Sequence, residues 1–216
     1  MPSHKVPKTF SVNFKLAIYG KYKTRLSKIQ EIKTYSFLTN SDAHSLPKIA
    51  REYQVFTLQD ATFNEFKKAL HNEDGRTIKA NYGFNPLLGK YYQTVCANCF
   101  NQIDSSLTVC PHCKSEMFIK GVSLRIKELS NDDAQKIARP PYIHQVPLEF
   151  IPGLGPKTLE RLIHKFGTEM NVLHHVTEEQ LETVVSSKLA RLIGKARRGE
   201  LKILHGGGGR YGKVIE

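Results

Sequence analysis

The sequence predicts an α+β protein of several small parts, and three observations support this fold class. Strand and helix patterns alternate between residues 35 and 82, four cysteines follow in the middle of the chain, and amphipathic helices fill the last third. We expect five segments: a basic leader at 1–34, a partial α/β segment at 35–92, a cysteine module at 93–139, a helical domain at 140–204 and a Gly-rich basic tail at 205–216.

The first patterned segment alternates strand and helix. We expect strands at Tyr35–Asn40, Gln54–Leu58 and Arg76–Tyr82, with a helix before the last of them that begins at the capping box Thr62–Glu65. This alternation is typical of α/β folds. The segment is too short to close a barrel, so these elements are expected to be the last units of something larger.

All four cysteines of the chain fall into one motif, C-x2-C-x10-C-x2-C, formed by Cys96, Cys99, Cys110 and Cys113. Two residues between paired thiolates let one tight turn aim both sulfurs at one ion, and four thiolates complete the tetrahedral shell of Zn²⁺. The spacing predicts a structural zinc ion in a ribbon-like module. The alternatives are a redox pair at Cys110 and Cys113, or two disulfides formed in an oxidising compartment.

The charge of the chain points to a polyanionic partner. There are 32 Lys and Arg residues against 20 Asp and Glu, a formal net charge of +12. Nucleic acid is the default partner for such a balance, and a solvated basic surface is the alternative. The basic residues gather at 1–40 and 191–213. No apolar run is long enough to cross a bilayer and no secretory signal is evident, so we expect a cytoplasmic protein without a membrane partner.

A Gly-x-Gly turn formed by Gly153 and Gly155 precedes an amphipathic helix. Glycines permit a tight turn whose backbone N–H groups point outward, and at the start of a helix such groups hold a phosphate. The segment resembles the non-specific DNA-binding hairpins of repair proteins. A simple αα corner is the alternative. The candidate phosphate contacts of this first hairpin are Gly153, Gly155, Lys157, Arg161 and Lys165.

A second, weaker copy of the hairpin follows. The capping box Thr177–Gln180 starts a short helix, and Ser186–Lys188 is expected to be a degenerate turn without glycines. Arg191, Lys195 and Arg198 line the polar face of the next helix and are further candidate contacts. Arg210 follows the run Gly206–Gly209, which is either a flexible tail or a close backbone approach to nucleic acid.

Asp42 and His44 follow the first expected strand. A carboxylate and an imidazole at the C-terminal end of a strand are common metal ligands. A capping Asp and a surface His are the alternative.

Several blocks of the chain resemble the endonuclease Q family, whose catalytic part is a PHP (polymerase and histidinol phosphatase) metal-dependent phosphoesterase domain. The likeness covers roughly residues 35–216, and its matching blocks are Leu38–Tyr53, Ala80–Gly83, Pro86, Leu88–Tyr91, the four cysteines and Gly206–Gly212. The resemblance implies a DNA-repair nuclease that nicks DNA at deaminated or abasic sites. It also implies that Asp42 and His44 are the last metal ligands of a PHP α/β barrel.

The sequence departs from this family in one important respect. The resemblance implies a multinuclear metal cluster whose ligands come from several sequence motifs, the first of which is H-x-H. This chain contains no H-x-H. Two ligands cannot hold such a cluster. We therefore expect this chain to be the C-terminal portion of the enzyme, which binds DNA but does not cleave it alone. Further divalent metal is expected to bind only if a complementary PHP fragment completes the site. The alternatives are a non-catalytic, zinc-stapled nucleic-acid-binding module and an RNA-binding or ribosome-associated zinc protein, in which basic charge and zinc ribbons also occur.

Overall fold

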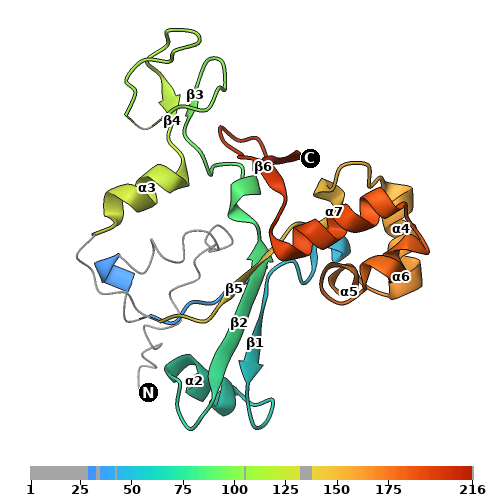
Figure 1. Cartoon of the computed structure of the whole chain (residues 1–216). Helices are drawn as coiled ribbons and strands as arrows, with labels where there is room; N and C mark the ends of the chain where they lie inside the picture. Colours follow the sequence, from blue (N-terminus) through green and yellow to red (C-terminus); the bar gives the residue numbers. More distant parts are fainter. Residues whose placement is uncertain (1–28, 33–34, 42, 105, 132–137, 216) are drawn as a thin grey trace. The chain divides into compact units, whose positions relative to one another are not determined.

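The computed structural model describes residues 29–32, 35–41, 43–104, 106–131 and 138–215 (Figure 1). The expected basic leader lies outside this part, apart from residues 29–32, of which Gln30–Ile32 form the 3-10 helix η3. The chain divides into two units, Met1–Gly83 with Ser130–Ile143 and Phe84–Leu129 with His144–Glu216. Among the described residues, no helix combines the length and the apolar character that crossing a membrane requires.

The first unit contains most of a three-stranded sheet, in the order β1-β2-β5. β1 (Tyr53–Thr57) and β2 (Thr77–Phe84) confirm two of the expected strands, while β5 (Tyr142–Gln145) is an addition. β1 pairs with β2 in antiparallel orientation, so the first two strands form a helix-linked antiparallel pair rather than a parallel α/β unit. The short 3-10 helix η4 (Leu46–Lys48) precedes β1.

Helix α2 (Phe63–His71) connects β1 and β2 and begins where the sequence predicts. The Thr62 hydroxyl accepts from the backbone N–H of Glu65 (3.3 Å), which is one half of a capping box. The other half is absent, because the Glu65 carboxylate accepts instead from Arg76 Nε (2.6 Å) and from the backbone N–H of Gln59 (2.9 Å). Glu65 thereby ties the start of α2 to the residues that flank both strands.

The strand expected at Tyr35–Asn40 does not form, and the prediction was wrong. Side chains from elsewhere in the first unit occupy carbonyl oxygens that a sheet partner would need. Arg139 donates to the Tyr35 carbonyl (2.7 Å), and the Asn81 amide donates to the Phe37 carbonyl (3.1 Å). The Arg139 guanidinium also lies 3.5 Å from the Phe37 ring centre. The segment is thus held by single side-chain contacts instead of a backbone ladder.

Four helices build the core of the second unit. They are preceded by the 3-10 helix η6 (Leu148–Phe150), and their bounds are α4 Pro156–Phe166, α5 Glu169–His174, α6 Glu178–Glu182 and α7 Ser187–Arg198. The apolar faces predicted from helical spacing meet in this core, where Leu162, Leu181 and Ile193 are fully buried. The predicted capping box at Thr177–Gln180 is confirmed with both of its hydrogen bonds.

The glycine run after α7 packs into the same unit. It lies between β6 (Lys202–Leu204) and β7 (Lys213–Ile215), which pair in antiparallel orientation. Gly206 N donates to the carbonyl of Leu87 (2.8 Å) in the 3-10 helix η5 (Pro86–Leu88), and the Gly206 carbonyl accepts from Gln93 N (2.9 Å). The run is therefore part of the packed fold, and the expectation of a flexible tail was wrong.

Close approach of main chain to main chain explains why glycine is needed there. A Cβ at Gly206 would lie 2.3 Å from the Gly89 carbonyl oxygen, and one at Gly207 would lie 2.6 Å from that of Gln93. Both glycines are buried. The partner residues were far away in the sequence, so the glycine composition alone suggested disorder.

The cysteine module completes the second unit. Its two strands, β3 (Val95–Cys96) and β4 (Phe118–Ile119), form an antiparallel pair, and helix α3 (Val122–Leu129) follows.

Candidate zinc site and nucleic-acid interface

Each pair of cysteines forms the same kind of turn. In the first, Cys96 N donates to the Asn101 carbonyl (2.9 Å) and Phe100 N donates to the Cys96 carbonyl (3.0 Å). In the second, Cys110 N donates to the Ser115 carbonyl (2.8 Å) and Lys114 N donates to the Cys110 carbonyl (2.9 Å). Phe100 and Lys114, directly after each pair, both have positive φ, 58° and 61°. The two turns present their sulfurs in equivalent ways.

The four sulfurs converge on one point. All four lie within 4.8 Å of one another, with Cys96 Sγ 3.4 Å from Cys113 Sγ and Cys99 Sγ 3.6 Å from Cys110 Sγ. In a tetrahedral site with Zn–S bonds of about 2.3 Å, the sulfurs stand roughly 3.8 Å apart. The donor set and its dimensions therefore fit a zinc ion. No other cluster of three metal-binding side chains occurs in the described part of the chain.

Hydrogen bonds to sulfur prepare part of the site for metal. The backbone N–H and side-chain amide of Asn101 lower the pKa of Cys99 to about 6. Backbone N–H groups, first that of Cys99, also lower the pKa of Cys96. The Ser115 N–H lowers the pKa of Cys113, but burial and the neighbouring thiols outweigh it and raise that pKa to about 11. A metal that takes four thiolates must displace this last proton, so its affinity rises with pH.

The turn before α4 combines a glycine of positive φ with a helix start that no side chain caps. Gly153 has φ +81°, a conformation that glycine adopts without strain, and Gly155 is the N-cap of α4 with Pro156 at its first turn. No side chain caps this helix. Among the described residues, no acceptor meets the backbone N–H of Gly155 or Lys157. Both residues are exposed, so these donors face solvent.

The second turn differs from the first in its capping. The Ser186 hydroxyl accepts from the backbone N–H of Leu189 (3.4 Å) and so caps α7. Both turns nevertheless lie side by side, because Pro152 and Gly153 line one cavity of about 250 Å³ together with Ser186, Lys188 and Leu189. The structure thus places the glycine turn and its predicted degenerate copy next to each other.

Arg191 and Lys195 come together in a second, basic cavity beside α7. This cavity has a volume of about 340 Å³ and shares Lys188 and Leu192 with the cavity at the two turns. Lys202 joins them from β6. Lys188 and Lys202 were not among the predicted contacts. Lys188 stands one helical turn before Arg191 and Leu192, a periodicity visible in the sequence, whereas the place of Lys202 depends on the fold.

Three of the arginines in this region bind other parts of the protein. Arg161 donates to the carbonyl oxygen of Val184, which links α4 to the residues after α6. Arg198 pairs with Glu178 (2.8 Å) and Glu200 (3.0 Å), so its charge is compensated. Arg197 is directed to the end of α5, where its Nε donates to the Leu173 carbonyl (2.8 Å). A count of the basic residues in this region therefore overestimates the positive charge that is available to a ligand.

Lys165 and Arg210, the remaining predicted DNA contacts, line neither of the two cavities. Lys165 is exposed on α4. The Arg210 guanidinium lies 3.9 Å from the Phe100 ring centre, so it binds the first cysteine turn. Asp42 lies outside the described residues, and His44 is exposed after an irregular segment rather than at the end of a strand.

Known proteins resemble this chain over most of its length, although no family model matches it. The Bacillus subtilis protein YqxK is 53% identical over 188 residues, which is 87% of this chain and 49% of that protein. The Methanocaldococcus jannaschii protein MJ0043 is 34% identical over 86% of this chain and 26% of its own length. The chain thus spans about half, or less, of the curated relatives it matches.

Two solved structures are similar in fold and sequence. One is the lesion-specific endonuclease PfuEndoQ from Pyrococcus furiosus, with a TM-score of 0.74 and 33% identity over 88% of this chain and 51% of that chain. The other is endonuclease Q in complex with a 27-mer duplex substrate that carries an abasic lesion at the active site, with a TM-score of 0.72 and 32% identity over 88% and 52%.

Proposed function

Because this chain belongs to the endonuclease Q family and spans about half of the solved members it matches, we propose that it is a DNA-binding chain of that type. The observation that carries the proposal is the pair of adjacent hairpin turns in the second unit, which continue into a basic cavity. The coordinates of a relative with a duplex substrate support DNA as the partner.

The proposed contact is to the phosphate backbone. The uncapped start of α4 offers the N–H groups of Gly155 and Lys157 to an anion, with the Lys157 side chain beside them. Lys188, Arg191 and Lys195 continue the positive charge along α7. Contacts of this kind fix the position of a strand without reading its bases, so the affinity is independent of sequence. In this proposal the helical domain is a helix-hairpin-helix domain whose first helix is reduced to η6.

Zinc has a structural role in the proposal. Four thiolates leave no open position for water or substrate, which separates this site from a catalytic zinc centre. The ion would hold the two cysteine turns together, and the Gln102 amide of this module donates to the His205 carbonyl (3.0 Å) beside the glycine run. By ordering the two cysteine turns, zinc would also stabilise the contact of this module with the hairpin β6–β7.

Cleavage is not proposed for this chain alone. A phosphoesterase of the PHP type needs several ligands from several strands, and the sequence contains no H-x-H. Asp42 and His44 would serve as metal ligands only if a complementary PHP fragment supplied the others. In that case the assembled protein would nick lesion-containing DNA and would bind further divalent metal in addition to zinc.

Fluorescence anisotropy with a labelled DNA duplex tests the binding proposal. We expect binding that weakens steeply with salt, and Lys157→Glu should weaken it roughly tenfold and flatten the salt slope by about 0.9, one phosphate contact. Lys127→Glu is the matched control, since Lys127 is exposed on α3 and the change in net charge is the same. Equal losses in both variants, or an affinity independent of salt, would contradict the proposal.

Metal analysis tests the division of roles. We expect one zinc per chain, lost when Cys99 is replaced by serine and retained when His44 is replaced by alanine. Nicking of an abasic duplex by the purified chain would refute the proposed need for a PHP fragment. Additional metal that disappears in His44→Ala would show a residual second site and would count against a purely structural metal.

A further inference from the structure

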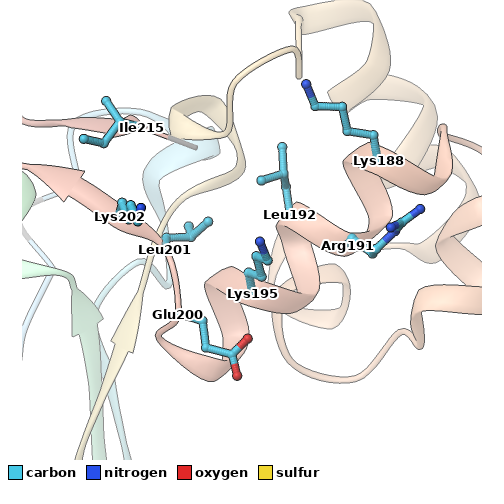
Figure 2. A pocket seen from close by; sticks show the side chains of 8 residues that line it. All are labelled: Lys188, Arg191, Leu192, Lys195, Glu200, Leu201, Lys202 and Ile215. Carbon is cyan, nitrogen blue, oxygen red and sulfur yellow. The ribbon is translucent and has the colours of Figure 1, made fainter.

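The basic cavity lies between helix α7 and the hairpin β6–β7 (Figure 2). Helix α7 supplies the first part of its lining, and the turn and strands that follow supply the rest. The lining residues are Lys188, Arg191, Leu192, Lys195, Glu200, Leu201, Lys202 and Ile215. All of them belong to the second unit, so the cavity is a feature of one compact body.

The cavity carries a net positive charge. Four cations line it, and Arg191, Lys195 and Lys202 form no ion pair with any described residue. The one acidic residue, Glu200, already pairs with Arg198 (3.0 Å). Its carboxylate therefore does not neutralise the lysines, and an anion that enters the cavity meets several uncompensated charges.

Phosphate binding alone does not account for the lining. Leu192, Leu201 and Ile215 line the same cavity, and Ile215 has 48% of its surface exposed. Against an inorganic anion or a duplex backbone these apolar groups would stay in contact with water, because phosphate oxygens cannot cover them favourably. A ligand that has an anionic group and an apolar face satisfies both halves of the lining.

The dimensions and the position favour one nucleotide of a DNA strand. A volume of about 340 Å³ lies at the small end of ligand cavities and is too small for a duplex. The cavity adjoins the paired hairpin turns through Lys188 and Leu192, where the strand is proposed to pass. In a duplex the bases are stacked inside, so only an unpaired nucleotide can turn its base or sugar toward a protein cavity.

We propose that the basic cavity holds one unpaired nucleotide of the bound strand. Its phosphate would contact Lys195 and Lys202, and its sugar and base would cover Leu201 and Ile215. The site would give the chain a preference for DNA with a single-stranded end or flap next to the duplex that the hairpins bind. This inference rests on the proposed DNA binding of the helical domain.

The experiment compares two labelled ligands of about 12 base pairs, a blunt duplex and the same duplex with an overhang of about three nucleotides. Kd is measured by fluorescence anisotropy for the wild type, Lys202→Glu, Ile215→Ser and the charge-matched control Lys127→Glu. Urea midpoints check that each variant is folded. Both Lys202 and Ile215 are exposed on short strands, so folded variants are expected.

The wild type should bind the overhang duplex roughly tenfold more tightly than the blunt duplex. Lys202→Glu should remove most of this preference and flatten the salt slope on the overhang duplex by about 0.7, one single-strand phosphate. Ile215→Ser should reduce the preference roughly threefold without changing the salt slope, since it removes an apolar contact. The control should leave the preference unchanged.

Two outcomes overturn the inference while DNA binding stands: equal affinity of the wild type for both ligands, or equal losses on both ligands in Lys202→Glu. Failure of the wild type to bind either duplex would instead refute the proposed function itself. A stronger preference for an RNA overhang than for a DNA overhang would also overturn the assignment to a DNA strand.

Discussion

Replacing Gly206 with alanine tests whether the glycine run is a packed part of the second unit. The new Cβ would lie 2.3 Å from the Gly89 carbonyl oxygen, 2.7 Å from Gly212 N and 2.9 Å from the Arg210 carbonyl oxygen. All three atoms belong to the backbone, so no side chain can turn away. Gly206 does not have positive φ, and the cost is therefore steric rather than conformational.

The magnitude follows from what must move. Overpacking of a tight contact costs about 1–3 kcal/mol. A shift of this backbone would also weaken the hydrogen bonds of Gly206 to Leu87 (2.8 Å) and Gln93 (2.9 Å), at about 0.5–1.5 kcal/mol each. We expect a loss of roughly 2–6 kcal/mol in the free energy of unfolding, by combination of these terms.

Urea unfolding followed by circular dichroism measures this loss as a lower midpoint at constant slope. Gly155→Ala is the control, because a Cβ there would meet nothing within 4 Å. At an unstrained position, replacing glycine with alanine is neutral or stabilises the protein by about 0.4–1 kcal/mol, because alanine lowers the conformational entropy of the unfolded chain. If Gly206→Ala behaved like this control, the packing described for the glycine run would be refuted.

Three further predictions concern the metal, the half-buried Arg197 and pH. Cys110→Ser, at a fully buried ligand, should lower the zinc content from one ion per chain to about none, measured by mass spectrometry of the native protein. Arg197→Met should cost roughly 2–3 kcal/mol in urea unfolding because three carbonyl oxygens at the end of α5 lose their donor, whereas Arg191→Met should change stability by under about 0.5 kcal/mol. The hydrogen bond from Arg76 lowers the pKa of Glu65 from 4.5 to about 2, so its stabilisation is present above about pH 4.5 and is lost as pH falls toward 2. The difference in urea midpoint between the wild type and Glu65→Gln should shrink across that range, and a constant difference would contradict the assigned partner.

Local spacing was sufficient to predict the cysteine module and the helical core. Each C-x-x-C turn is closed by hydrogen bonds within six residues, and the capping box at Thr177–Gln180 is equally local. Such features depend little on the rest of the fold, so the sequence predicts them well.

Features that depend on distant partners could not be read in this way. The segment Tyr35–Asn40 has strand propensity, but Arg139, which lies about a hundred residues later, donates a hydrogen bond to the carbonyl oxygen of Tyr35. The basic cavity was only half predicted for the same reason. Its α7 residues share one helix face, whereas Lys202 and Ile215 reach it through the β6–β7 pairing.

The contact between the cysteine module and the glycine run has a consequence for how the protein folds during synthesis. Gln102 and His205 are joined by a hydrogen bond across 103 residues. The cysteine turns and the helices rely on nearby contacts and can form as soon as each is made. The hairpin β6–β7 must then close a loop that encloses most of the second unit, at an entropic cost that is met only when that unit is largely built. Zinc is thus expected to bind before the hairpin β6–β7 pairs. The side of the basic cavity that β6 and β7 supply forms only when this pairing is complete.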